Sequence, residues 1–317
     1  MDGFVVDIPW IFRWILVHLF VVPRRRKTSA VLYGNIWTEE GSPLLVNSMK
    51  LLNKLRKKDR FARYELAMRY GEPSIESAIK VLMEDGPTHI DILPLYPQYA
   101  LSSTESCLHL CRNVFKKLGY KGEVAYFREF FDHPSYLRVV VETINETLRE
   151  HAIDFLLYSY HGLPEHQVAA TGSKCCFDEK CCRQFKEHSP KCYRAQCYQT
   201  TKLCNQGLAW PDSKSATAFQ SRLGKRPWLR PYTDEFVRDL PQQGVKNLGV
   251  VCPSFTADCL ETIEEICFRI KDDFQRAGGD KVFLVPSLND RDDWVDAISE
   301  ITSDRNQNPV RFPLIEK

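Results

Sequence analysis

The feature that most constrains the fold is a plan of helix, glycine, apolar strand and proline that occurs twice. Ser74–Gly86 has the pattern of a helix with a serine N-cap, and HIDILPLYPQY (89–99) then has the pattern of a strand that breaks into a proline-rich loop. Thr233–Gly244 and NLGVVCPSF (247–255) repeat that order. Such alternation of helices and strands predicts parallel sheets covered by helices.

A third strand pattern places the boundary between the two similar halves. DFLLYSYHGLP (Asp154–Pro164) is an apolar run whose strand is expected to end at His161, and the boundary is expected just before it, near Glu146–Ile153. We therefore predict an α/β fold of two Rossmann-like domains, with parallel sheets flanked by helices and an active-site cleft between them. The predicted domains are 1–148 and 149–317.

Composition excludes one broad class of partner. The 317 residues are 44% hydrophobic, which is enough for a substantial core, and the formal net charge is only +2. A nearly neutral chain lacks the basic field that attracts nucleic acid, so we expect no nucleic-acid partner.

The N-terminal segment is almost entirely apolar from Phe4 to Val22 and is followed by a basic cluster at 24–27. A signal peptide has its basic residues before the apolar run, and a spanning helix needs about 20 apolar residues with few charges. Four residues interrupt the run: Asp7, Pro9, Arg13 and His18. We expect an aromatic-rich lip that packs on the protein, an apolar ligand or the membrane surface, and an ordinary buried helix stays open as the alternative. Peripheral membrane contact through 4–27 follows from the first interpretation. We separately expect a cytoplasmic location, with any such contact at the inner membrane face.

His161 is the first candidate for chemistry, because it directly follows the apolar run FLLYSY and precedes Gly-Leu-Pro. Strand ends in open α/β sheets are where side chains reach a ligand crevice. Imidazole exchanges protons near neutral pH and also binds first-row metals. The alternative is a histidine that only hydrogen-bonds a turn.

The second candidate is an acid-rich segment, VVCPSFTADCLETIEEI (Val250–Ile266). If Asp258 lies in the first helical turn, then Asp258, Glu261 and Glu265 share one helix face at i, i+3 and i+7. Carboxylates gathered in a partly dry cleft attract cations and carry protons. A solvated helix face is the alternative, and Glu264 is a secondary candidate.

Trp228 stands between two prolines in the sequence Pro-Trp-Leu-Arg-Pro. The neighbouring prolines restrict the backbone on both sides, so the indole is expected to form a rigid flat wall for a planar aromatic ligand. The alternative is an ordinary core tryptophan.

Several stretches of this chain resemble the ferrochelatases, which insert ferrous iron into protoporphyrin IX. The histidine stretch YSYHGLPE and the acidic stretch VCPSFTADCLETIEEI are similar to two signature motifs of that family. Three further stretches also match: IWTEEGSPL, LPLYPQYALSST and FQSRLGKRPWLRPYTDE. The resemblance is greatest to the proteobacterial type and runs from about Phe4 to Leu288.

The resemblance implies a lyase that forms protohaem and releases two protons in the last step of haem biosynthesis. It implies that His161 takes pyrrole protons or binds the entering Fe²⁺, and that Glu261 is the acidic partner on the opposite side of the porphyrin. Asp258 and Glu265 would relay metal or protons, and Trp228 would line the porphyrin site. A catalytically silent tetrapyrrole-binding or iron–sulfur protein, a coproporphyrin chelatase and another divalent metal are the alternatives.

The chain departs from the family at its beginning. Family members usually start with a strand that ends in an Asn-Leu-Gly-Thr-Pro-like turn, whereas this sequence starts at Met1-Asp2-Gly3, directly before the lip. We therefore expect either a short start or a first sheet that lacks this strand.

A second departure is a cysteine-rich insert at 172–205. Seven of the chain's 12 cysteines lie here: Cys175, Cys176, Cys181, Cys182, Cys192, Cys197 and Cys204. A polar segment of this kind is poorly suited to bury itself, so a metal centre is expected to organise it. Disulfides are not expected in a cytosolic enzyme, while zinc and a [2Fe–2S] cluster each need four ligands.

Some ferrochelatases carry a [2Fe–2S] cluster, and the resemblance therefore favours that cofactor over zinc or free thiols. The quartet expected to hold it is Cys175, Cys182, Cys192 and Cys197, with Cys176 and Cys181 as substitutes. The sequence leaves open what the cluster does and the oligomeric state.

Overall fold

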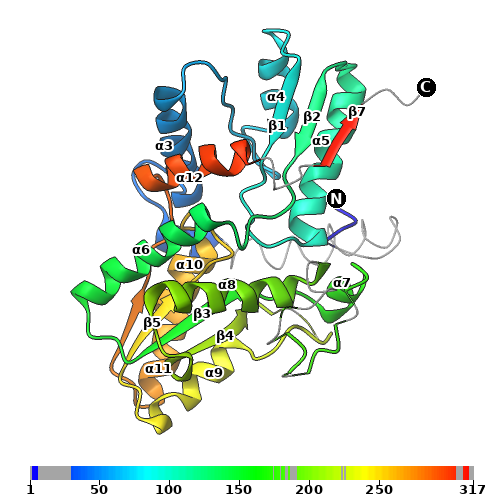
Figure 1. The fold of residues 1–317 in the computed structure, drawn as a ribbon. Coiled ribbons are helices and arrows are strands. Elements are labelled where there is room, and N and C mark those ends of the chain that lie inside the picture. The colour runs from blue at the N-terminus through cyan, green and yellow to red at the C-terminus, as the bar shows by residue number, and fades with distance from the viewer. Residues whose placement is uncertain are drawn as a thin grey trace.

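The computed structural model describes residues 2–5, 30–173, 175–178, 180–182, 185, 191–222, 224, 226–304 and 310–313. Figure 1 shows two lobes, each built around a sheet with helices packed on it. The α/β class predicted from the sequence is confirmed.

The sheet of the first lobe has three strands in the order β1-β2-β7. β1 (His89–Ile92) and β2 (Glu123–Tyr126) are parallel, as the sequence predicted. β7 (Val310–Pro313) comes from the far end of the chain and pairs antiparallel with β2. The chain thus returns to add an antiparallel edge strand to the predicted parallel pair, a common feature of α/β sheets.

The helices of the first lobe include the one predicted to start at Ser74. The side-chain oxygen of Ser74 accepts a hydrogen bond from the N–H of Ser77 at 3.2 Å, and Gly86 follows the helix end with φ +61°. This is the expected pairing of a serine N-cap with a glycine that tolerates the left-handed region. The helices are α3 (Pro43–Lys58), α4 (Ile75–Met83), α5 (Ser106–Leu118) and the preceding π-helical turn Leu101–Glu105.

The sheet of the second lobe has four parallel strands in the order β4-β3-β5-β6. The strands are β3 (Phe155–His161), β4 (Ser215–Gln220), β5 (Asn247–Val251) and β6 (Lys281–Leu284). The described helices of this lobe are α7 (Glu165–Ala169), α8 (Tyr193–Leu208), α9 (Thr233–Asp239), α10 (Leu260–Glu264) and α11 (Lys271–Arg276). A π-helical segment, Glu265–Ile270, joins α10 to α11, and the short 3₁₀ turns are Asp212–Lys214 and Pro241–Gln243.

β3 is central in this sheet, and its first six residues are buried. A strand covered on both faces needs a continuous apolar run rather than an alternating one, and FLLYSY provides it. The strand ends at His161, as predicted.

Two helices join the lobes. α6 (Pro134–Glu150) and α12 (Asp292–Ser303) pack on each other, and Trp294 of α12 is fully buried against Phe130 and Tyr136, with ring centroids 6.0 and 6.2 Å apart. Because α12 and β7 follow the second sheet in sequence, the chain crosses back toward the first lobe (Figure 1). The division at 148/149 stays a prediction, and β7 shows that the first sheet also takes residues from beyond it.

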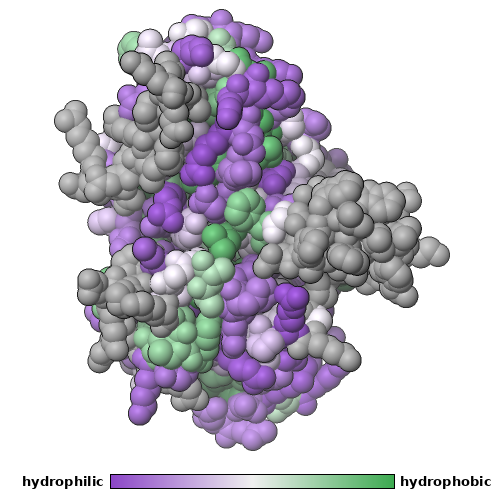
Figure 2. Space-filling view, turned by 90° about the vertical axis from the view of Figure 1, so that its right-hand side faces the viewer, coloured by the Kyte–Doolittle hydropathy of each residue, from purple (hydrophilic) through white to green (hydrophobic). Residues whose placement is uncertain are grey.

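Most of the apolar lip, including the interrupting residues and the basic cluster at 24–27, lies outside the described residues. Before it, Asp2 is bound to the first lobe by Arg69 at 2.7 Å and by the Tyr70 hydroxyl at 2.8 Å. On the face drawn in Figure 2, hydrophilic residues dominate and apolar residues gather in a narrow strip along the middle. No helix within the described ranges is long and apolar enough to cross a membrane.

Candidate functional site

On its β5 side, the backbone of His161 is held by side chains rather than by a strand. β5 pairs with β3 only as far as Tyr158, so the two backbone groups of His161 on that side have no strand partner. The N–H of His161 donates to the Ser254 hydroxyl at 3.2 Å, and its carbonyl accepts from the Tyr193 hydroxyl at 2.8 Å. Both polar groups are thereby satisfied at a strand end.

The imidazole of His161 has one nitrogen occupied. Nδ1 lies 2.7 Å from the carbonyl oxygen of Gly162, and we assign the proton to Nδ1 because a carbonyl only accepts. In the neutral ring Nε2 then keeps its lone pair, which is able to take a proton or bind a metal. The ring is half-buried and meets Phe255 edge-on at 6.2 Å. His161 therefore does hydrogen-bond its turn, but with only one nitrogen.

The turn after His161 is packed closely enough to require glycine. A Cβ at Gly162 would lie 2.6 Å from the backbone oxygen of Gln220 and 3.4 Å from the ring of Trp228. Trp228 forms a β-bridge with Pro164, on the other side of this turn, and is half-buried. The structure therefore places Trp228 beside the turn that follows His161.

Asp258 does not lie in the first helical turn, so the prediction that three carboxylates share one helix face is wrong. α10 begins at Leu260, and its N-cap Cys259 is extended with φ −148° and ψ −169°. A capping box between Cys259 and Thr262 starts the helix after Asp258. The Asp258 carboxylate instead accepts hydrogen bonds from the Thr262 hydroxyl at 3.0 Å and from Asn289 Nδ2 at 2.7 Å.

Glu265 is buried and its carboxylate is also occupied. It accepts from the N–H of Ser221 at 3.1 Å and from the Ser221 hydroxyl at 2.6 Å, and Arg269 lies 3.6 Å away. The secondary candidate Glu264 is buried and pairs with the same arginine at 3.0 Å. These two acids are therefore held by the protein itself.

Glu261 differs from the other acids of this segment. It is half-buried in the first turn of α10, its carboxylate is in hydrogen-bonding contact with the Cys259 thiol, and, unlike Glu264 and Glu265, it is joined by no salt bridge to any of the described cations. Burial, the Glu261 carboxylate and the Cys259 thiol together raise the pKa of Tyr33, which places that phenol beside the acid. Gln220 Nε2 donates to the backbone oxygen of Glu261 at 2.7 Å, while Gln220 is also the β-ladder partner of His161. Glu261 and His161 thus lie at the same edge of the sheet.

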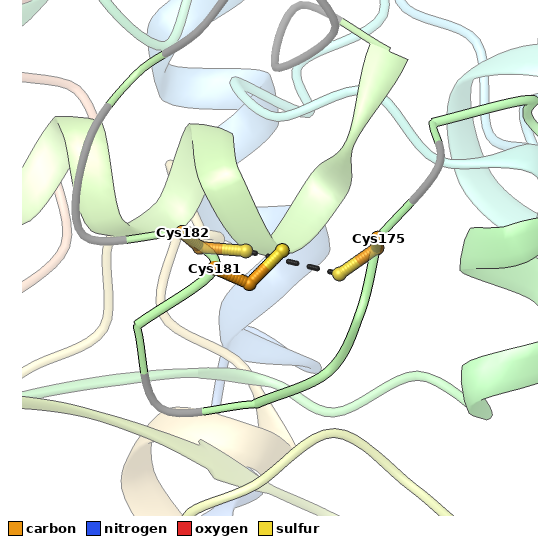
Figure 3. A group of neighbouring side chains, drawn as sticks. All are labelled: Cys175, Cys181 and Cys182. Atoms are coloured by element: carbon orange, nitrogen blue, oxygen red, sulfur yellow. Dashed lines mark hydrogen bonds between the residues drawn. The ribbon is translucent and has the colours of Figure 1, made fainter.

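A second candidate centre is the cysteine group, which we define as Cys175, Cys181, Cys182 and Cys192. The sulfur atoms of Cys175, Cys181 and Cys182 all lie within 4.8 Å of one another, and the Cys175 and Cys182 sulfurs are 3.8 Å apart (Figure 3). The Cys192 thiol is in hydrogen-bonding contact with those of Cys175 and Cys182. Three members of the predicted quartet therefore meet, joined by the predicted substitute Cys181.

The other predicted cysteines lie around this group. Cys197 is fully buried on α8, where its thiol is hydrogen-bonded to Tyr193. Cys176 is exposed and its N–H donates to the Cys181 sulfur at 3.2 Å. Neither belongs to the set of three sulfurs within 4.8 Å of one another.

The thiols of the group differ in acidity. The Cys175 thiol lowers the pKa of Cys182, but the Cys192 thiol and burial outweigh it and raise that pKa to about 12. Burial also raises the pKa of Cys181, but the N–H and thiol of Cys176 and the neighbouring thiols more than offset it, so its pKa is lowered. Cys181 is therefore the member most readily ionised without a metal.

A buried arginine lies beside these thiols. Arg194 of α8 is 3% exposed, donates to the backbone oxygen of Asp178 at 2.9 Å and is in hydrogen-bonding contact with the Cys182 thiol. Its Nε is buried, and no described residue accepts a hydrogen bond from it. A buried cation with one unused donor fits a site that becomes anionic when the thiols ionise.

Sequence reasoning missed the residues that hold His161 and Glu261 in place. Tyr193, Ser254 and Gln220 lie in three separate segments, and their roles depend on contacts across the sheet. A serine directly after a strand-ending proline was the only local signal for any of them.

Comparisons with known proteins agree on the family. The family profile described as "Ferrochelatase" matches residues 1–306. A ferrochelatase of Coxiella burnetii (strain Dugway 5J108-111) is 43% identical over 306 residues, covering 95% of this chain and 84% of that protein. A ferrochelatase of Pseudomonas savastanoi pv. phaseolicola is 41% identical over 304 residues, covering 95% and 89%. Among solved structures, SirB from Bacillus subtilis with Fe³⁺ is similar in fold, with TM-score 0.53 and 13% identity over 83% of this chain and 90% of that one.

Proposed function

This chain belongs to the ferrochelatase family, and we propose that within it His161 and Glu261 carry out the insertion of Fe²⁺ into protoporphyrin IX. The enzyme is a metal chelatase, a lyase. In the reaction two pyrrole N–H bonds break, two protons leave, and four nitrogens bind one dication, so charge balances. The site therefore needs a proton acceptor, a group that receives the metal and a route for protons to solvent.

The observation that carries the proposal is the orientation of the His161 ring. Nδ1 is occupied by the Gly162 carbonyl, while the backbone on both sides of the ring is held by Tyr193 and Ser254. The free nitrogen in the neutral ring is Nε2, and a base with a fixed direction accelerates proton transfer. In our proposal Nε2 takes a pyrrole proton or receives the iron.

Glu261 is the proposed partner because, unlike Glu264 and Glu265, it has no described cation at ion-pair distance and, unlike Asp258, it lies in the first turn of α10. A carboxylate without a cationic partner is available to attract Fe²⁺ or to receive a proton. Asp258 and Glu265 are proposed as the relay behind it, and Gln220 connects Glu261 to Glu265, with Nε2 3.5 Å from the Glu265 carboxylate. Trp228 is proposed as the flat wall for the macrocycle.

We propose that Cys175, Cys181, Cys182 and Cys192 hold a [2Fe–2S] cluster, since four closely placed thiols supply the ligand number that such a cluster needs. Four thiolates around a cluster leave a net negative charge, which the buried guanidinium of Arg194 would offset. When bound, such a cluster supplies one-electron redox chemistry and a structural crosslink. Zinc in the same thiols is the alternative, since four thiolates also satisfy tetrahedral Zn²⁺.

Anaerobic purification with optical spectra and analysis of iron, zinc and acid-labile sulfide separates these two cofactors. We expect visible bands that Cys181→Ser removes and that Cys197→Ser retains, because Cys197 contacts Tyr193 rather than the group. A colourless protein that contains zinc would show that the bound metal is zinc rather than a cluster. Loss of the visible bands in Cys197→Ser would contradict the proposed set of four ligands.

We also infer peripheral membrane contact through 4–27. Directly after the basic cluster, Val31 and Trp37 are 66% and 58% exposed, which supports an apolar surface on this side of the chain. The full-length protein should sediment with vesicles that contain anionic lipid. Equal binding to neutral vesicles and to vesicles with anionic lipid would contradict a role for the basic cluster in membrane contact.

A further inference from the structure

The first turn of α8 carries contacts to both candidate centres at consecutive residues. Cys192 is the N-cap of α8, and its thiol contacts Cys175 and Cys182. Tyr193 is the first residue of the helix, and its hydroxyl donates to the His161 carbonyl at 2.8 Å. Cys192, whose thiol belongs to the cysteine group, is therefore the immediate sequence neighbour of Tyr193, which holds His161.

Tyr193 replaces a missing strand contact. The ladder between β5 and β3 ends at Tyr158↔Val251, so the His161 carbonyl has no partner on β5. The Tyr193 hydroxyl fills that place and lies 3.2 Å from the Ser254 hydroxyl, which in turn accepts the His161 N–H.

We propose that Tyr193 is a positioning residue that couples metal occupancy of the cysteine group to the direction of the His161 ring. The inference rests on the proposed metal site. A metal that binds Cys192 fixes the start of α8, and the peptide to Tyr193 passes that constraint to the His161 carbonyl. Without metal, only thiol contacts would hold Cys192, so we expect the Tyr193 hydroxyl to be less firmly positioned and the Nε2 lone pair to be less well aligned with the porphyrin. A misplacement of this kind lowers turnover by about 100-fold.

The test is a double-mutant cycle in the full-length protein: wild type, Tyr193→Phe, Cys182→Ser and the double variant. Cys182 is chosen because it lies outside α8, so its loss empties the group without altering the helix sequence. Tyr158→Phe is the matched control, because it removes a buried hydroxyl that bonds Asn205 at 3.0 Å and leaves His161 untouched.

Two readouts are needed. The first is kcat and KM for iron insertion, and the second is the ¹⁵N shift of the His161 ring in porphyrin-free protein, assigned with His161→Ala. We expect Tyr193→Phe to keep the metal, to lower kcat by about 100-fold with KM unchanged, and to shift the ¹⁵N signal. Cys182→Ser alone should change the ¹⁵N shift of His161, whereas adding Cys182→Ser to Tyr193→Phe should cause no further change.

Three results would contradict the coupling. One is a Tyr193→Phe protein with the same kcat and ¹⁵N shift as Tyr158→Phe. The others are a double variant whose loss of kcat equals the product of the losses in Tyr193→Phe and Cys182→Ser, and a Cys182→Ser protein with an unchanged ¹⁵N shift of His161. The metal and sulfide analysis tests the cluster proposal independently of this cycle. Zinc without acid-labile sulfide contradicts the [2Fe–2S] cofactor alone, and the same cycle then compares zinc-loaded with empty thiols.

Discussion

The turn at His161 and the cysteine group are linked through the first turn of α8, yet they are held in different ways. His161 donates hydrogen bonds to the Ser254 hydroxyl and the Gly162 carbonyl and accepts one from the Tyr193 hydroxyl. The cysteine group consists of thiols that contact mainly one another, with raised pKa values at Cys175 and Cys182. The first region is preorganised by the protein, whereas the second, in our proposal, is organised when a metal replaces the thiol protons.

The largest expected effect is on the acid opposite His161. Glu261→Gln removes the charge that attracts Fe²⁺ and the oxygen that receives a proton, so insertion should fall by about 1,000-fold. Porphyrin binding should remain detectable by absorbance titration, because the planar contacts are unchanged. Near-normal turnover would refute the role of Glu261.

The second effect is on the cysteine group. Cys182→Ser should remove the bound metal and lower the midpoint of thermal unfolding, because metal binding contributes to folding free energy. Cys204→Ser is the matched control, since Cys204 is a fully buried thiol on α8 outside the group. Retained metal in Cys182→Ser would exclude Cys182 as a ligand.

The third effect tests whether the His161 turn is rigid by packing. Gly162→Ala places a Cβ 2.6 Å from the Gln220 backbone oxygen, so the turn must move. We expect a loss of about 1–3 kcal/mol in the free energy of unfolding and a kcat lower by about 100-fold. Gly172→Ala is a poor control because Gly172 has φ +72°, whereas Gly34→Ala adds a Cβ with no atom within 4 Å. Equal kcat values for Gly162→Ala and Gly34→Ala would show that the turn is pliable.

The smallest effect concerns thiol reactivity in metal-free protein. Cys181 has a lowered pKa and Cys182 a pKa of about 12, so iodoacetamide at neutral pH should alkylate Cys181 first. Mass spectrometry of timed samples measures both rates. Faster alkylation of Cys182 would contradict the described arrangement of the thiols.

Local patterns predicted much of the fold, whereas the site residues remain predictions. The serine cap at Ser74, the strand ending at His161 and the α/β alternation follow from residue spacing, and the structure confirms them. Two features were not predicted from these patterns. β7 is recruited from the far end of the chain, which no local pattern indicates, and the start of α10 depends on a capping box rather than on the spacing of acids.

The acids of the predicted face illustrate the limit. Helical spacing treats Asp258, Glu261 and Glu265 as equals, but only partners distant in sequence distinguish them. Asn289 and Ser221 occupy two of the carboxylates and leave Glu261 without such a partner. Likewise, the choice of Cys181 over Cys197 depends on how the segment folds onto α8.

The most direct test of the account is anaerobic haem formation from Fe²⁺ and protoporphyrin IX by the full-length protein, measured beside His161→Ala. We predict turnover by the wild type and a rate lower by about 1,000-fold or more in His161→Ala, with unchanged thermal unfolding. Absence of haem formation by the intact protein, or equal rates for the two proteins, would contradict the assignment of His161 as the reacting base.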